Sequence, residues 1–149
     1  MKPTKFTLDI SVDCPAAVVR KWWTEFPAEY SAKDPVEPHR VVTSKILPHG
    51  KVLATYWHGP DGKEIQIEQV MTLKPDGSWE FDLTHPAGYH VHERFRASEG
   101  KGRTLLKVTA EVTPQNAKAE AEIQAQVDWM ESRFRRWAKV CERDALSTH

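Results

Sequence analysis

Alternating hydrophobic and polar residues at the start of the chain predict a β-strand. Between Phe6 and Val12, apolar side chains occupy every second position and polar side chains occupy the positions between them. This period of two is typical of a strand with one buried face. The sequence DCP follows, in which Asp13 or Cys14 can cap a helix that has Pro15 in its first turn. We therefore expect a helix directly after this strand.

Two short helices are predicted in the region after the first strand. Apolar residues recur there at the three- and four-residue spacing of a helix: Val19, Trp22, Trp23 and Phe26. Pro27 then ends this helix or starts another in the segment PAEYSA. Both helices are expected to be short.

Regularly spaced turn sequences divide the region from about residue 36 to residue 112. The turns are HG at 49–50, GPDG at 59–62, PDG at 75–77, HPAG at 85–88 and EGKG at 99–102. Connections this short join antiparallel neighbours. We therefore predict a meander of about six strands, and about seven strands when the first one is included.

The period of the hydrophobic pattern changes again near the C-terminal end. Thr113 is a good N-cap with Pro114 as the first helical residue, and a helix of about 30 residues is expected to follow. One apolar stripe runs along it: Ile123, Val127, Met130, Phe134, Trp137 and Cys141. The stripe could form a coiled-coil seam, but an exposed sheet face in the same chain favours packing on the sheet. Arg133 is expected outside this interface.

The composition excludes several classes of protein. The 149 residues suit one domain, spanning residues 1–149. Basic and acidic side chains balance at 21 each, so no general attraction to nucleic acid is indicated. The sequence has no apolar run near the ~20 residues of a membrane span, and its start lacks the apolar core of a secretory signal, so we expect a cytoplasmic protein without membrane insertion.

The two cysteines, Cys14 and Cys141, lie far apart in the sequence and match no CxxC metal or redox pattern. We interpret them as buried, reduced thiols. The chain also contains no glycine-rich phosphate-binding pattern. We therefore expect no cofactor.

The order of these elements resembles the helix-grip fold of the START and birch-pollen-allergen-like superfamily, also called SRPBCC. Its class is α+β, with a curved antiparallel sheet wrapped around a long C-terminal helix. The opening DCPAAVVRKWWTEFPAEY is similar to the superfamily's strand, Pro-Ala, Val-rich helix and Thr-x-Phe-Pro opening, and TLLKVTAEVTP resembles its last strand. The resemblance covers nearly the whole chain, but its motifs are structural and do not identify a reaction.

This resemblance implies an apolar cavity between the sheet and the long helix. Members of the superfamily bind lipids, sterols, polyketides or plant hormones, some catalyse cyclisation or dehydration of polyketides, and others bind a protein client. No nucleotide or metal is common to them, and the cysteine and histidine set of the Rieske branch is missing from this sequence. The resemblance also implies that Cys14 and Cys141 are close in space.

Strand alternation, independently of the resemblance, predicts which residues face the cavity. Together with the helical stripe it gives this set: Ile67, Gln69, Met71, Trp79, Phe81, Leu83, Tyr89, Val91, Glu93, Phe95, Val108, Val127, Met130 and Phe134. If the turns are tight, Leu83 lies opposite Gln69 and Val91, and Phe81 lies opposite Glu93. In the segment KVLATYWH the alternation leaves two possibilities: either Tyr56 and His58 face the cavity, or Thr55 and Trp57 do.

Glu93 is the acidic residue in an otherwise apolar row of the segment GYHVHERFRA. Three interpretations are open: an acid that only supports the fold, a ligand contact, or a group that transfers protons. Burial should raise its pKa unless a donor such as Gln69, Tyr56 or a buried water is in reach. Proton transfer usually needs a second positioned group, for which we consider Tyr56 or His58.

Histidines in the same region raise the question of a metal site. His90 and His92 share one strand face, and His85 is near in sequence. Hairpin pairing would place Asp82 opposite His92 and Glu80 opposite Arg94, which favours surface charge pairs over a metal site. The basic segment RFRRWAK at 133–139 contributes aromatic residues to the buried stripe, so nucleic-acid binding is not expected.

The sequence therefore favours a protein that binds a hydrophobic or amphipathic small molecule of lipid-, polyketide- or aromatic-like character. One alternative is a polyketide cyclase/dehydratase-like enzyme that uses Glu93. Another is a protein-interaction module whose cavity has collapsed. We expect a monomer or a weak homodimer.

Overall fold

The computed structural model of the chain describes residues 2–25, 34–36, 39–58 and 63–147. Its elements, in chain order, are β1 (Thr4–Val12), α1 (Ala16–Glu25), β2 (His39–Leu47), β3 (Gly50–His58), β4 (Glu64–Leu73), β5 (Trp79–His85), β6 (Tyr89–Gly100), β7 (Arg103–Pro114), α3 (Ala117–Ala121) and α4 (Ile123–Ser147). The second short helix predicted in the segment PAEYSA falls outside the described residues.

All seven strands form one antiparallel sheet in the order β1-β7-β6-β5-β4-β3-β2. The strands from β2 to β7 follow one another as neighbours, and β1 pairs with β7, so the predicted meander is confirmed. The predicted turns at 49–50, 75–77, 85–88 and 99–102 are present, whereas the one at 59–62 falls outside the described residues. Gly77 and Gly88 adopt φ values of 86° and 96°, a region that favours glycine. The sheet therefore follows the turn pattern of the sequence.

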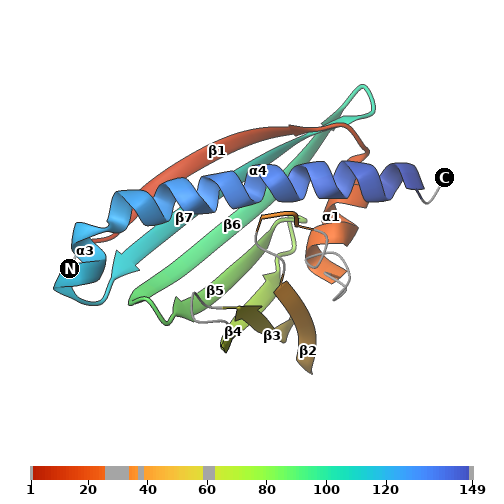
Figure 1. Ribbon diagram of the computed structural model, residues 1–149. Helices are drawn as coiled ribbons and strands as arrows, with labels where there is room; N and C mark the ends of the chain where they lie inside the picture. The colour runs from red at the N-terminus through yellow and green to blue at the C-terminus, as the bar shows by residue number, and fades with distance from the viewer. Residues whose placement is uncertain (1, 26–33, 37–38, 59–62, 148–149) are drawn as a thin grey trace.

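Helix α4 lies across one face of the curved sheet, and the chain has the predicted helix-grip architecture (Figure 1). Figure 1 also shows α3 at the start of α4 and α1 beside its C-terminal half. The indole Nε1 of Trp22 in α1 donates to Asp144 of α4 over 3.1 Å. This contact fixes α1 against the end of the long helix.

The predicted start of the C-terminal helix, with Thr113 as N-cap, is wrong. Thr113 and Pro114 extend β7 and pair with His90 and Tyr89 of β6. Asn116 caps α3 instead, because its side chain accepts a hydrogen bond from the Ala119 amide over 2.8 Å. Pairing with a neighbouring strand has overridden a good local capping sequence, and a break at residue 122 separates α3 from α4.

An aromatic cluster packs between the sheet and the helices. Phe95 of β6 is at its centre, and its ring centroid lies 5.5 Å from Phe134 of α4, 5.7 Å from Phe81 of β5 and 6.0 Å from Trp23 of α1. Rings at these distances and tilts attract one another in addition to burying apolar area. The cluster therefore ties α1 and α4 to the sheet.

Both cysteines are buried, and their side chains are joined by a hydrogen bond. The expectation that Cys14 and Cys141 are close in space is thus confirmed. Burial raises the pKa of both thiols, which keeps them protonated and poorly reactive.

Candidate ligand-binding pocket

A pocket lies between the sheet and α4. Its cavity volume is about 40 Å³. The lining residues are Trp23, Val41, Leu53, Thr55, Gln69, Phe81, Leu83, His85, Val91, Glu93, Phe95, Gln126, Met130, Arg133, Phe134 and Trp137. The pocket is therefore a small cleft with mostly apolar walls.

Many of the residues predicted for the cavity face line this cleft: Gln69, Phe81, Leu83, Val91, Glu93, Phe95, Met130 and Phe134. The others are placed in the packed interior or at its margin: Ile67, Met71, Trp79, Tyr89, Val108 and Val127. Tyr89 is an example of a predicted residue outside the cleft. Its hydroxyl donates to the Ala119 carbonyl over 2.8 Å, so its side chain lies against α3. Alternation identifies the inner face of a strand but not how far along that face the cleft extends.

The inward face of β3 is now defined. Thr55 is 0% exposed and lines the cleft, and its hydroxyl accepts a hydrogen bond from Gln69 Nε2 over 2.8 Å. Tyr56 is half-buried on the opposite face, and the side chains of Trp57 and His58 lie outside the described part of the chain. Gln69 therefore bonds to Thr55, and Tyr56 does not supply the second polar group considered for Glu93.

Glu93 points into the cleft, as the alternation in β6 predicts. It is 6% exposed and lies opposite Phe81 on one side and Ala110 on the other. Among the described residues, none forms a hydrogen bond with its carboxyl group. Burial raises its pKa to about 7, against a smaller opposing effect of the Arg133 charge. Near neutral pH the carboxyl group is therefore present in both protonation states.

Arg133 also lines the cleft and is only 7% exposed, so the expectation that it lies outside the helix–sheet interface is wrong. The helical geometry gives the reason: position 133 follows Gln126 by two turns and Met130 by one, on the face that meets the sheet. A guanidinium group stays charged at any ordinary pH. The helix thus brings a permanent positive charge into the same cleft as Glu93.

His85, the last residue of β5, is a third ionisable group in this cleft. Burial and the Arg133 charge lower its pKa to about 4, so the imidazole is neutral near pH 7. Its Nδ1 accepts a hydrogen bond from the Ala87 amide over 3.1 Å, which orients the ring. The sequence suggested only Tyr56 or His58 as partners for Glu93, whereas the structure places His85 and Arg133 there.

Several further lining residues were not in the set predicted for the cavity face: Trp23, Val41, Leu53, Gln126 and Trp137. Trp137 also donates from Nε1 to Asp34 over 3.0 Å, and the same carboxylate pairs with Arg136. Among the described residues, the buried Nε1 of Trp23 has no hydrogen-bond partner. Tryptophan at helical spacing was the available signal for Trp23 and Trp137, but it did not distinguish core from cleft.

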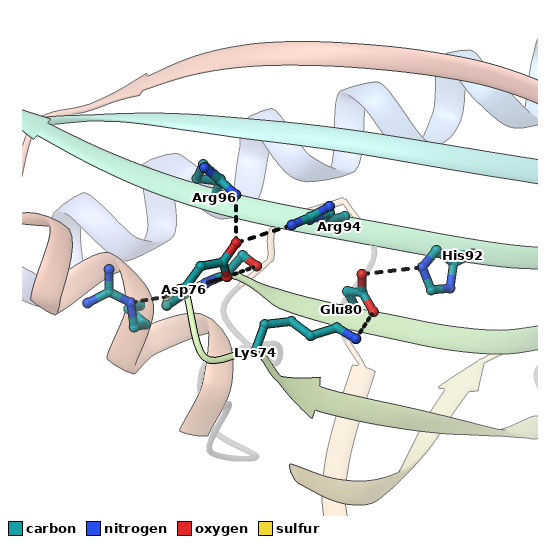
Figure 2. Close-up of polar contacts among 9 residues, drawn as sticks. Lys74, Asp76, Glu80, His92, Arg94 and Arg96 are labelled. Carbon is teal, nitrogen blue, oxygen red and sulfur yellow. Dashed lines mark hydrogen bonds and ion pairs between the residues drawn. The ribbon is translucent and has the colours of Figure 1, made fainter. Parts of the chain in front are cut away.

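The opposite face of the sheet carries a surface charge network (Figure 2). Asp82 bonds to His90 over 2.9 Å and to His92 over 3.2 Å. Asp82 pairs in register with His92 and Glu80 with Arg94, as predicted, although the Arg94 guanidinium contacts Asp76. Within the described part of the chain, no three His, Cys, Asp or Glu side chains are arranged to hold a metal ion.

Comparisons with known proteins identify structural relatives without a related sequence. No family model matches the chain. No curated protein matches it either. Among solved structures, the ZhuI aromatase/cyclase from Streptomyces sp. R1128 superposes with a TM-score of 0.78 at 16% identity, covering 96% of each chain.

Two other solved structures show the same fold. A START superfamily protein from Mycobacterium smegmatis matches over 100% of both chains with a TM-score of 0.71 at 12% identity. The di-domain ARO/CYC BexL from the BE-7585A biosynthetic pathway matches over 95% of this chain with a TM-score of 0.72 at 21% identity. The chain spans about half of BexL, namely 49% of its length.

In the ranges that the structure describes, no helix is both long and apolar enough to span a membrane. The element order, the sheet topology and the superpositions agree with the resemblance seen in the sequence. The chain therefore has the helix-grip fold of the START and birch-pollen-allergen-like superfamily.

Proposed function

We propose that the protein binds a hydrophobic or amphipathic small molecule in the cleft between the sheet and α4. The observation that carries this proposal is the composition of the walls, in which aliphatic and aromatic side chains surround a few polar groups from separate elements. Small-molecule sites typically combine an apolar lining with a small number of placed polar groups. The fold supports the proposal by analogy only.

The size of the cleft restricts the ligand. A cavity of about 40 Å³ is smaller than the roughly 300–1,000 Å³ of typical small-molecule pockets, so side chains must move apart when a ligand enters. A larger ligand requires side chains such as Leu83, which is half-buried at the cleft, to change rotamer.

Binding can be measured with N-phenyl-1-naphthylamine, an uncharged dye whose fluorescence rises in apolar surroundings. We expect saturable binding by the wild-type protein. Leu83→Trp places a larger side chain in the cleft and should weaken binding at least about tenfold, equivalent to about 1.4 kcal/mol. Thr84→Trp adds the same side chain at the exposed neighbouring position and should bind the dye like wild type.

Equal affinities of the wild type and Leu83→Trp would contradict the proposed site. Absence of dye binding by all three proteins would favour the interaction module with a collapsed cavity. Circular dichroism of each variant provides the control for folding.

A second candidate function is an enzyme of the polyketide cyclase/dehydratase kind. It is favoured by the presence of Glu93, with its pKa raised to about 7, and the neutral imidazole of His85 in one cleft. A carboxyl group that titrates near neutral pH can both donate and accept a proton. Catalysis would differ from binding in one measurable respect, because Glu93→Gln would abolish turnover while preserving affinity.

A further inference from the structure

The ionisable side chains that line the cleft come from different walls. Among the described lining residues they are Glu93 on β6, His85 on β5 and Arg133 on α4. The other described lining residues are apolar or uncharged, including Thr55 and Gln69, which bond to each other. A ligand lying between sheet and helix would thus meet one acid, one base and one permanent cation.

We propose that the ligand is an amphipathic acid, whose anionic group pairs with Arg133 and accepts a hydrogen bond from the protonated carboxyl group of Glu93. Its apolar part lies along the aliphatic and aromatic walls near Leu83, Phe81 and Met130. This inference rests on the proposed function and specifies the class of molecule that the same cleft takes. Arginine suits the role because its planar guanidinium matches the geometry of a carboxylate.

The charge balance of the cleft explains why a proton is part of the complex. If Glu93 is ionised, it neutralises Arg133, and a second anion would meet a like charge in an environment of low dielectric. If Glu93 is protonated, it no longer repels a second anion, and its carboxyl group becomes a hydrogen-bond donor. A bound anion would favour this second state, so binding should be accompanied by proton uptake.

The surroundings of Glu93 contain few competing groups. Charged or titratable side chains reach the cleft from α4, as Arg133, and from β5, as His85, whereas β3, β4, β7 and α1 contribute none among the described lining residues. His85, with its pKa lowered to about 4, stays neutral between about pH 6 and pH 8.5. The pKa of Glu93, raised to about 7, lies within this range. A change in the affinity for an acidic ligand between about pH 6 and pH 8.5 therefore reports on Glu93.

The test measures how well decanoate, decanol and decylamine displace N-phenyl-1-naphthylamine at about pH 6 and about pH 8.5. At the lower pH we expect decanoate to bind at least about tenfold more tightly than decanol, and decylamine to bind most weakly. Above the pKa of Glu93 the affinity for decanoate should fall by about tenfold per pH unit, which gives a loss of roughly 30-fold at about pH 8.5. Decanol should bind equally at both values.

Two variants separate the roles of the charged residues. Arg133→Met replaces the charged side chain by an apolar one of similar length. This variant should lose the preference for decanoate while dye binding persists. Glu93→Gln should retain the preference and lose its pH dependence. Arg135→Met, two residues further along the same helix and exposed, is the matched control and should behave like wild type.

The wild-type comparison alone can overturn the inference, so the result does not depend on the stability of any variant. If the dye binds but decanoate shows no advantage over decanol at the lower pH, the proposed acid specificity is false and the proposed function stands. If the dye itself does not bind in the cleft, the proposed function fails as well.

Discussion

Phe134→Ala is expected to lower the free energy of unfolding by about 3 to 5 kcal/mol, the usual cost of deleting a buried aromatic side chain. Phe134 is 2% exposed and packs between α4 and the sheet. Its ring centroid is 5.5 Å from Phe95 and 6.4 Å from Trp137. Truncation would remove both ring contacts and enlarge the cleft beside them. Urea denaturation followed by circular dichroism measures the loss.

Arg135→Ala is the matched control for this variant. Arg135 is the next residue of the same helix but is exposed, so its truncation should change stability by about 0.5 kcal/mol or less. Met130→Ala, at another buried position of the stripe, should cost about 2 to 5 kcal/mol. Small and equal losses in all three variants would show that a different face of α4 packs on the sheet.

Glu93→Gln is expected to stabilise the protein at alkaline pH and to leave its stability nearly unchanged at about pH 4. The pKa of Glu93 is raised from 4.5 to about 7 in the folded protein, so the folded state retains a proton that the unfolded chain releases. Stability is therefore lost as the pH rises from 4.5 towards 7. At 1.36 kcal/mol per pKa unit, the loss above this range is about 3 kcal/mol, and glutamine cannot ionise.

His85 produces the opposite pH dependence. Its pKa is lowered from 6.5 to about 4, so stability is lost as the pH falls from 6.5 through 4, because the unfolded chain takes up a proton first. In the wild type the two effects oppose each other between about pH 4.5 and 6.5. Glu93→Gln should therefore reveal a rise in stability with pH in this window. Parallel stability curves for wild type and variant from about pH 4 to pH 8.5 would refute the assignment of Glu93.

The local pattern of the sequence predicted most of the fold. Strand alternation and glycine turns gave the order of the strands from β2 to β7, and tight turns fixed the register that places Phe81 opposite Glu93. The same alternation gave the inward direction of Glu93, because a shift by one residue would bury His92 and Arg94. These features depend on interactions between neighbours in the sequence or across one turn.

The site residues that the sequence did not predict depend on contacts between distant parts of the chain. Arg133 shares a helical face with Met130, but its charge suggested solvent, and only the packing of α4 on the sheet shows that the guanidinium enters the cleft. His85 has the same parity as Phe81, yet its place in the HPAG turn sequence connected it with the surface histidines instead. The extent of the cleft also depends on β3, for which the sequence left two possible inward faces.

A crystal structure of the protein with decanoic acid at about pH 6 would test the central claim most directly. We predict electron density for the acid between the sheet and α4, with its carboxylate next to Arg133 and Glu93 and its chain along Phe81 and Met130. A ligand bound elsewhere on the protein, with the cleft between sheet and helix empty, would contradict this account.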